Sequence, residues 1–344
     1  MRVKLEDVCE RGSSNIKQSD IIKMSGNYPI YGASGLAGKV NFYHQEQPYV
    51  AVVKDGAGIG RTTLNPAKSS VIGTMQYLIP KKNVLPEYLF YVVSYMHLEK
   101  YYTGATIPHI YFKDYKNEEF NLDNIEKQLE IIDVLGRCKK VIEARKQELV
   151  ELDSLTKARF VELFGDPRSN PFGFEKKRLK DTCKVITGNT PSRAIAEYYG
   201  DYIEWIKTDN IVSGILNPTQ ATESLSEKGM NVGRTVEKDS ILMACIAGSI
   251  ASIGRVCITD RTVAFNQQIN AVVPEQYNIL FLYVLFQMSK DYLVEDINMA
   301  LKGILSKSKL EEKEFIIPPM DLQEQFSDFV KQVNKFFRLQ SMMG

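Results

Sequence analysis

The chain has 344 residues, which is long for one domain, and its 44% hydrophobic and 25% charged residues are typical of a globular protein. At first sight, the 43 Lys and Arg against 42 Asp and Glu argue against a protein built to hold nucleic acid or an anionic membrane. Five Cys without a C-x-x-C pair, three scattered His and no long apolar run exclude a disulfide framework, a zinc site, a signal peptide and a membrane span, so we expect a cytoplasmic multi-domain protein.

The predicted elements follow one another in the same order in both halves of the chain. Short segments rich in Val, Ile, Tyr and Phe, separated by Gly, Asn and Ser turns, predict strands. Each half then continues with a helix and closes on a second, longer helix. The predicted strands include 49–53, 76–79, 240–243 and 270–273, and the first helices span about 86–99 and 278–294.

Four short matches in the same order indicate that the chain is an internal duplication. The offset between the halves grows along the chain, as insertions in loops would produce. The matched segments are 3–10 with 177–184, 59–61 with 253–255, 87–96 with 279–288, and 125–128 with 322–325. Because the period is far longer than that of a solenoid repeat, each unit must be a domain with an added helix.

The closing helix of the first half is predicted from about Asn124 to Phe164, with Asp123 as its N-cap and Gly165 to Pro167 as its stop. At about 1.5 Å per residue it reaches about 60 Å, more than one domain needs. The second closing helix follows Pro318-Pro319 and has only about 20 residues before the chain ends. Apolar residues three or four apart predict that the helices pair through a seam. The seam residues are Leu129, Ile132, Leu135, Ile142, Leu149 and Leu152 in the first helix, and Phe326, Phe329, Val333 and Phe336 in the second.

No catalytic motif is present in the sequence. The chain lacks G-x-x-x-x-G-K-[ST], G-x-S-x-G and H-E-x-x-H, and it lacks the Asp/Asn-Pro-Pro-aromatic tetrapeptide of an amino-methyltransferase. The Gly-rich segment 54–61 resembles a dinucleotide loop only superficially, because no helix is predicted after it. We therefore predict a protein without enzymatic activity of its own and without a metal site.

Polar, Gly-rich loops occur at equivalent places in the two halves and are the candidate nucleic-acid contacts. Arg can bind guanine and Asn or Gln can bind adenine in the major groove, while Lys, Ser, Thr and backbone amides suit phosphate. Arg61 and Arg255 both follow a Gly at matching places in the two halves, and we expect them to be the most reliable pair of DNA-contacting candidates. The candidates in the first half are Tyr31, Ser34, Lys54, Arg61, Lys68, Thr106 and His109, and those in the second are Asn189, Thr190, Arg193, Lys207, Asn210, Ser249, Arg255, Gln267, Gln268 and Lys302.

The order of these features resembles the DNA specificity subunit of Type I restriction–modification enzymes. Strings typical of that family are 28–35 (YPIYGASG), 158–167 (ARFVELFGDP), 185–192 (VITGNTPS), 264–270 (AFNQQIN) and 317–325 (IPPMDLQEQ). They are individually loose but jointly specific, and the resemblance covers essentially the whole chain.

The resemblance implies an α+β fold in which two duplicated β-rich target recognition domains are joined and followed by long helices that form an antiparallel coiled coil. Each domain would read one half of a bipartite, asymmetric DNA sequence, and the helices would set the gap. Two methyltransferase (modification) subunits and restriction/translocase subunits would be the partners. S-adenosylmethionine, ATP and Mg would bind those partners, with no cofactor on this chain. The expected bounds are 1–123 and 166–318 for the two domains, 124–165 for the spacer helix and 319–344 for the distal helix.

Two points stay open at this stage. The second helix is about half as long as the first, so it could cover only about residues 145–164 of its partner. The seam at Leu129, Ile132, Leu135 and Ile142 would then lack a partner from the same chain. We expect a modification subunit or a second copy of the chain to cover it. The alternative function is a DNA-binding scaffold or regulator with the same duplicated domains but no methyltransferase partner.

The charge of each domain is close to neutral. Residues 1–123 contain 14 basic and 12 acidic side chains, and residues 166–318 contain 18 basic and 19 acidic ones. We therefore expect the chain alone to bind DNA weakly.

Overall fold

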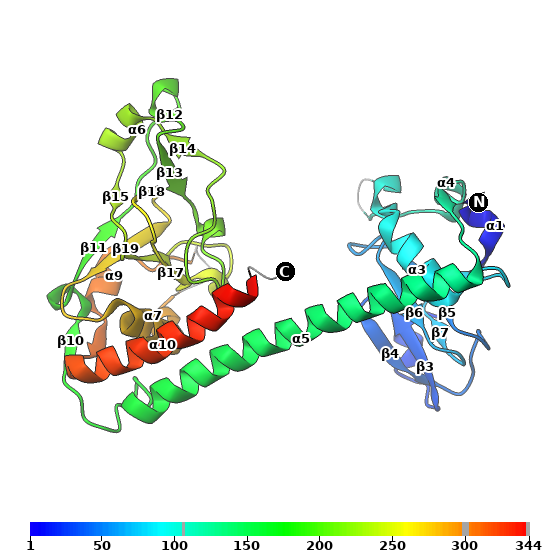
Figure 1. The fold of residues 1–344 in the computed structure, drawn as a ribbon, viewed down its shortest axis with the longest axis horizontal. Coiled ribbons are helices and arrows are strands. Elements are labelled where there is room, and N and C mark those ends of the chain that lie inside the picture. Colours follow the sequence, from blue (N-terminus) through cyan, green and yellow to red (C-terminus); the bar gives the residue numbers. More distant parts are fainter. Residues whose placement is uncertain (105–106, 298–302, 342–344) are drawn as a thin grey trace. The chain divides into compact units, whose positions relative to one another are not determined.

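The structure is a computed structural model that describes residues 1–104, 107–297 and 303–341, with the side chains of 336–341 excepted. The chain forms two compact units, residues 1–144 and 145–344. Their boundary lies inside helix α5, Ile125–Phe164, which has 40 residues (Figure 1). The first half of this helix therefore belongs to unit 1 and the second half to unit 2.

Unit 1 contains an antiparallel sheet of four strands in the order β2-β8-β5-β6 and a sheet of three strands in the order β4-β3-β7, in which β3 and β7 are parallel. The first and last strands of the unit, β1 and β9, pair with each other. The strands are β1 (Arg2–Lys4), β2 (Cys9–Ser13), β3 (Tyr28–Gly32), β4 (Gly35–Val40), β5 (Tyr49–Val53), β6 (Thr62–Asn65), β7 (Ser70–Val71), β8 (Met75–Pro80) and β9 (Glu119–Asn121). The helices are α1 (Leu5–Val8), α2 (Gln18–Ile21), α3 (Pro86–Tyr95), η1 (Leu98–Tyr101) and α4 (Phe112–Tyr115).

Strand β5 is an uninterrupted apolar run, and its side chains are buried in the two hydrophobic cores of unit 1. Because successive side chains of a strand point to opposite faces, Val50 and Val52 enter the core formed with α3, where Leu89 also lies. Tyr49 and Val53 enter the core on the other face, formed with the three-stranded sheet. Both faces of the strand are covered, and burial of this apolar surface stabilises the unit.

Unit 2 contains an antiparallel sheet of four strands in the order β11-β19-β16-β17 and a sheet in the order β12-β14-β13-β18-β15, in which β13 and β18 are parallel. Strands β10 and β20 pair with each other. The strands are β10 (Lys176–Arg178), β11 (Cys183–Thr187), β12 (Tyr199–Gly200), β13 (Ile203–Ile206), β14 (Ser224–Leu225), β15 (Thr235–Val236), β16 (Ile241–Ala244), β17 (Val256–Ile258), β18 (Val263–Phe265), β19 (Ile269–Pro274) and β20 (Glu314–Ile316). The helices are α6 (Glu227–Val232), α7 (Ile279–Met288), α8 (Lys290–Val294), α9 (Lys307–Glu312) and α10 (Met320–Ser341), with short 3-10 turns η2 (Leu179–Asp181), η3 (Ala196–Tyr198), η4 (Thr208–Asn210) and η5 (Ile250–Ser252).

The two units have the same plan, which confirms the duplication. The four-stranded sheets correspond strand by strand, the parallel pair β3–β7 corresponds to β13–β18, and α3 corresponds to α7. One predicted match is wrong, because the sequence comparison placed Gln128 opposite Gln325. In the structure Gln128 accepts a hydrogen bond from the N-cap residue of α3. The equivalent bond in unit 2, from the N-cap residue of α7, is accepted by Gln323 and not by Gln325. The correct register differs by two residues, since a short polar match carries no information about which face of a helix is buried.

Helix α10 lies antiparallel to the C-terminal part of α5 (Figure 1). The ring of Phe326 is 5.5 Å from that of Phe160 and 5.6 Å from that of Phe164. One turn further along α10, the ring of Phe329 lies 6.0 Å from the guanidinium of Arg159. The predicted pairing of a long and a short helix is therefore present within unit 2.

Most predicted elements occur within one or two residues of the expected positions, and three details differ. The helix predicted at 86–99 ends at Tyr95 and is followed by η1, and the one predicted at 278–294 is divided into α7 and α8. The N-cap of α5 is Asn124, whose Oδ1 accepts from the backbone N–H of Lys127 at 2.9 Å. Asp123 instead accepts a hydrogen bond from the hydroxyl of Tyr88. The α+β class is confirmed, whereas the four expected domain bounds stay predictions.

Candidate nucleic-acid interface

In unit 1 the hairpin that joins β5 to β6 brings several candidate residues together. The backbone N–H of Gly60 donates to Val53 at 2.9 Å, which closes the hairpin loop. Arg61 then extends to the loop after β3, where its Nη1 donates to the carbonyl of Ala33 at 3.0 Å. Ser34, the next residue, is exposed. Arg61 is thus both a structural link between two loops and an exposed cation beside them.

Asp55 joins the same hairpin to the segment that carries His109. Its Oδ1 lies 2.7 Å from Nδ1 of His109, and its other oxygen forms an ion pair with Lys54. Partial burial would raise the pKa of Asp55, but the hydrogen bonds from Lys54 and His109 outweigh it and lower that pKa. Lys54 and His109 are therefore held by a carboxylate, and sequence reasoning did not select Asp55 as a site residue.

Unit 2 repeats this backbone arrangement with different side chains. Asp55 and His109 form an isolated antiparallel bridge, and Ile246 and Ile304 form the equivalent bridge after β16. Ile304 is 43% exposed. The two units therefore present a charged group and an apolar group at equivalent positions.

Arg255 occupies the position in unit 2 that corresponds to Arg61. Gly254 donates to Ala244 at 2.8 Å to close the hairpin between β16 and β17. The guanidinium of Arg255 donates to the carbonyl of Thr208 at 3.1 Å and to that of Ser252 at 3.3 Å. Arg255 is half-buried, so it links loops more than it faces solvent.

A second group of candidates in unit 2 surrounds Trp205. Arg193 and Lys207 both form ion pairs with Glu223, at 2.6 Å for Arg193. The hydrogen bonds from Lys207 and Arg193 lower the pKa of Glu223. Asn189 accepts a hydrogen bond from the indole N–H of Trp205 through its backbone carbonyl. Tertiary structure thus gathers residues that are widely separated in sequence, and Glu223 and Trp205 were not predicted.

Asn210 does not face solvent as a base-reading residue would. Its side chain is buried, accepts from the backbone N–H of Lys207 at 3.0 Å, and donates to Thr219 and Gln220. All the bonding capacity of its amide nitrogen is used within the chain. The DNA contact of Asn210 therefore stays a prediction, and in this structure the side chain closes the turn η4.

The remaining candidates lie in varied surroundings. Gln267 is exposed and pairs with Thr190, and Gln268 is half-buried and bonds Asn266. Ser249 is exposed and bonds Ser252, while Tyr31 is half-buried and Lys68 is exposed, 4.0 Å from Glu46. Thr106 and Lys302 lie outside the described residues. None of these positions identifies a base contact by itself.

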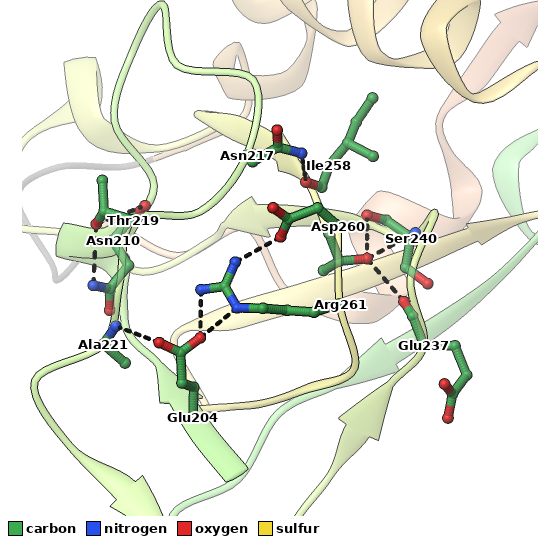
Figure 2. Close-up of polar contacts among 11 residues, drawn as sticks. Glu204, Asn210, Asn217, Thr219, Ala221, Glu237, Ser240, Ile258, Asp260 and Arg261 are labelled. Atoms are coloured by element: carbon green, nitrogen blue, oxygen red, sulfur yellow. Dashed lines mark hydrogen bonds and ion pairs between the residues drawn. The ribbon is translucent and has the colours of Figure 1, made fainter. Parts of the chain in front are cut away.

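A hollow of about 590 Å³ in unit 2 is lined by Tyr202, Ile203, Glu204, Pro218, Gln220, Arg261 and Thr262. Figure 2 shows the guanidinium of Arg261 facing the carboxylates of Glu204 and Asp260, with Nε donating to Glu204 at 2.5 Å and Nη1 donating to Asp260 at 2.6 Å. Partial burial would lower the pKa of Arg261, but its bonds to the two carboxylates raise it. Two negative charges against one positive charge disfavour phosphate at this hollow.

The sequence analysis could not predict this hollow, because Glu204 and Arg261, which meet there, are 57 residues apart in the chain. Among the described residues, no group of three His, Cys, Asp or Glu is placed to hold a metal ion. None of the described helices is both long enough and apolar enough to cross a membrane.

The helix seam divides into covered and open parts. Phe326 and Val333 are buried, Phe329 and Leu152 are half-buried, and Leu149 is 40% exposed. In unit 1, Leu129, Leu135 and Ile142 are exposed, whereas Ile132 packs against the core of its own unit. The expectation that Ile132 lacks a partner in its own chain is therefore wrong. The side chain of Phe336 lies outside the described residues.

Comparison with known proteins gives this arrangement a family. The model of the Type I restriction modification DNA specificity domain matches residues 1–153 and 171–341, once on each repeat. The chain belongs to this family. The resemblance inferred from the sequence strings is thereby confirmed.

Two curated relatives agree with the assignment. The Type I restriction enzyme HindI specificity subunit of Haemophilus influenzae is 35% identical over 117 residues, which are 33% of this chain and 24% of the relative. The MjaIX specificity subunit of Methanocaldococcus jannaschii is 26% identical over 281 residues, which are 74% of this chain and 63% of the relative. The chain thus spans less than two thirds of the length of these specificity subunits.

The fold is similar to that of the crystal structure of a Type I restriction-modification system S subunit from M. genitalium, with a TM-score of 0.62 and 14% identity over 100% of this chain and 91% of that one. A chain from a structure concerning complex assembly and conformational transition of the type I R-M system gives a TM-score of 0.53 and 15% identity, and covers 100% of this chain and 93% of that one. At these identities the likeness concerns the fold alone.

Proposed function

We propose that this protein is the sequence-specific DNA-recognition subunit of a Type I restriction–modification complex and acts in the cytoplasm. The observation that carries the proposal is the match of the specificity-domain family to each of two structural repeats. Each repeat would read one half of a bipartite, asymmetric target. The charged pair at Asp55 and His109 and the apolar pair at Ile246 and Ile304 support different halves, because charged groups and apolar groups select different base edges.

The helices α5 and α10 set the gap between the half-sites in this proposal and dock two methyltransferase subunits. The exposed apolar residues Leu129, Leu135 and Ile142 support a docking role, since a partner that covers them would remove their apolar surface from water. The docking partner is a modification subunit, or a second copy of the chain where that subunit is absent. Restriction/translocase subunits complete the complex.

The proposed protein recognises DNA and performs no reaction itself. S-adenosylmethionine, ATP and Mg would be bound by the partner subunits, and this chain would contribute base selection and assembly. The near-neutral charge of each domain supports a division of labour in which the partners help to hold the duplex.

Sequencing of methylated bases in the host, with and without the gene, tests the proposal. We expect methylation at one bipartite motif to disappear when the gene is deleted and to return with a plasmid copy. A plasmid copy in which residues 1–123 come from another specificity subunit should change one half of the motif and leave the other half intact. If deletion removes no motif, the recognition function is contradicted.

The alternative, a DNA-binding scaffold or regulator with no methyltransferase partner, is distinguished by co-purification. Stable association with a modification subunit supports the restriction–modification complex. DNA binding without such a subunit supports the alternative.

A further inference from the structure

We propose that Arg193 is the residue through which the second domain recognises a guanine, and that Glu223 is the positioning residue that holds its guanidinium. The inference rests on the proposed function and deepens it, because it names one side chain and one base.

The guanidinium of Arg193 is fixed by contacts from three segments of unit 2. Its carbon lies 4.4 Å from the ring centroid of Tyr199 and 5.2 Å from that of Trp205. Glu223 accepts a hydrogen bond from Nη2 at 2.6 Å through Oε2. A planar cation over an aromatic ring with a carboxylate at one edge has few orientations left. The side chain is nevertheless 57% exposed, so its other edge can face a ligand.

The aromatic platform is itself tied to the loop that carries Arg193. Trp205 is 3% exposed, and its indole N–H donates to the carbonyl of Asn189 at 3.3 Å. The hydroxyl of Tyr199 donates to the carbonyl of Pro191 at 2.6 Å. These bonds hold the segment before Arg193 against the rings. Binding through Arg193 would therefore lose little conformational freedom, which is the advantage of a preorganised contact.

The two other predicted cations of this domain that the structure describes, Lys207 and Arg255, fit the role less well. Lys207 shares Glu223 with Arg193, but its side chain is only 26% exposed. Arg255 is half-buried and donates to the two carbonyls of Thr208 and Ser252. Arg193 therefore combines an ordered guanidinium with access to a ligand.

Guanine is the base whose major-groove edge suits this geometry. Its O6 and N7 are adjacent acceptors that the two donors of a guanidinium can bind together, whereas the N6 amino group of adenine would meet those donors with a donor of its own. One such bidentate contact discriminates about 5- to 150-fold against the wrong base. Glu223 contributes by fixing the plane, and its single negative charge also offsets one of the two positive charges of Arg193 and Lys207, which weakens indiscriminate binding of phosphate.

The test uses the complete restriction–modification complex in its host, with methylated motifs sequenced for wild type, R193A, R193K and E223Q. K228A is the matched control, because Lys228 is 71% exposed and pairs with Glu197 in the same domain without a contact to Trp205. We expect R193A and R193K to accept other bases at one guanine of the half-site of the second domain. The other half-site should be unchanged, and K228A should give the wild-type motif.

E223Q has a separate expected result in solution. With purified complex and a non-cognate duplex, we expect tighter binding than wild type and a steeper salt dependence, by about one released ion, because the substitution removes one negative charge. The only tryptophan of the chain, Trp205, reports by fluorescence whether the cluster remains folded in each variant.

Three other results would overturn the assignment of Arg193 to a guanine. If R193K leaves the motif unchanged, the residue acts as a simple positive charge and the guanine assignment is overturned. Loss of all methylation in both Arg193 variants, or a change in the half-site of the first domain, also overturns it. A wild-type complex that methylates no bipartite motif contradicts the proposed function itself, which is a different result from these.

Discussion

Gln128 and Gln323 are equivalent buried residues that fasten the two closing helices to their own units. Gln128 Oε1 accepts from the backbone N–H of Leu85 at 2.9 Å, and Gln323 Oε1 accepts from that of Asn278 at 2.9 Å. In both cases the donor is the N-cap residue of the preceding helix, α3 or α7. The amide nitrogens complete the attachment by donating to nearby carbonyls. One buried amide in each unit thus links the start of the closing helix to the preceding helix.

Replacement of Gln128 by Ala should lower the free energy of unfolding of unit 1 by about 2–4 kcal/mol, because buried polar backbone groups lose their partners. Urea denaturation measures the change. Gln147 is the control, since it lies exposed on the same helix and bonds only Glu151 among the described residues. Q147A should change stability by less than about 0.5 kcal/mol. Equal effects of Q128A and Q147A would show that the buried amide does not stabilise the attachment.

The charged pair of Asp55 and His109 predicts a pH-dependent contribution to stability. Lys54 and His109 lower the pKa of Asp55 in the folded state despite the opposing effect of burial. An Asp with a lowered folded pKa stabilises the protein above its unfolded pKa of about 3.9, and this contribution is lost as pH falls through the folded pKa.

We therefore expect D55N to be less stable than wild type at pH 6, with a difference that shrinks as the pH falls below about 4. Denaturation curves at several pH values measure this difference. D209N in an exposed turn of unit 2 serves as the control and should show no such trend. A D55N difference that is constant with pH would contradict the assignment.

The hairpin glycines Gly60 and Gly254 should differ in their tolerance of a methyl group. Both have positive φ, +80° and +78°, so alanine costs about 1–2 kcal/mol at either position. At Gly60 the added Cβ would also lie 2.6 Å from the backbone nitrogen of Glu99, whereas at Gly254 the nearest atoms are 3.8 Å away. We expect G60A to lower the urea midpoint clearly more than G254A. Similar midpoints would show that the segment at Glu99 moves away easily.

The exposed apolar side chains of α5 predict a loss of assembly without a loss of folding when they are replaced by charged ones. Leu129 and Ile142 are each 54% exposed, so a variant with Glu at both positions should fold normally but fail to retain the modification subunit in a pull-down. I132E is the contrasting variant and should lower stability, because Ile132 packs against the core of unit 1. Retention of the modification subunit by the double variant would show that Leu129 and Ile142 do not contribute to its docking.

Local patterns in the sequence were enough to predict central strands of each unit, the long helices and the duplication. Segment 49–53 is apolar throughout because both faces of β5 are covered, and the stripe that includes Phe326 and Val333 marks a buried helix face. Such patterns can be recognised in the sequence because burial repeats with the period of the element itself. The register of Gln128 against Gln323 could not be predicted in this way, since a buried amide is chosen by its partner and not by a period.

The sequence by itself determined the class of fold, the two repeats and the family resemblance, because these depend on hydrophobic spacing and on short strings along the chain. Only the tertiary structure decided which polar residues are free to meet a ligand. It buries Asn210 in a turn, places Arg193 on Tyr199 beside Glu223, and joins Glu204 to Arg261. These pairs come from distant segments, and the charge and hydrogen bonds of a side chain depend on the neighbours that folding brings to it.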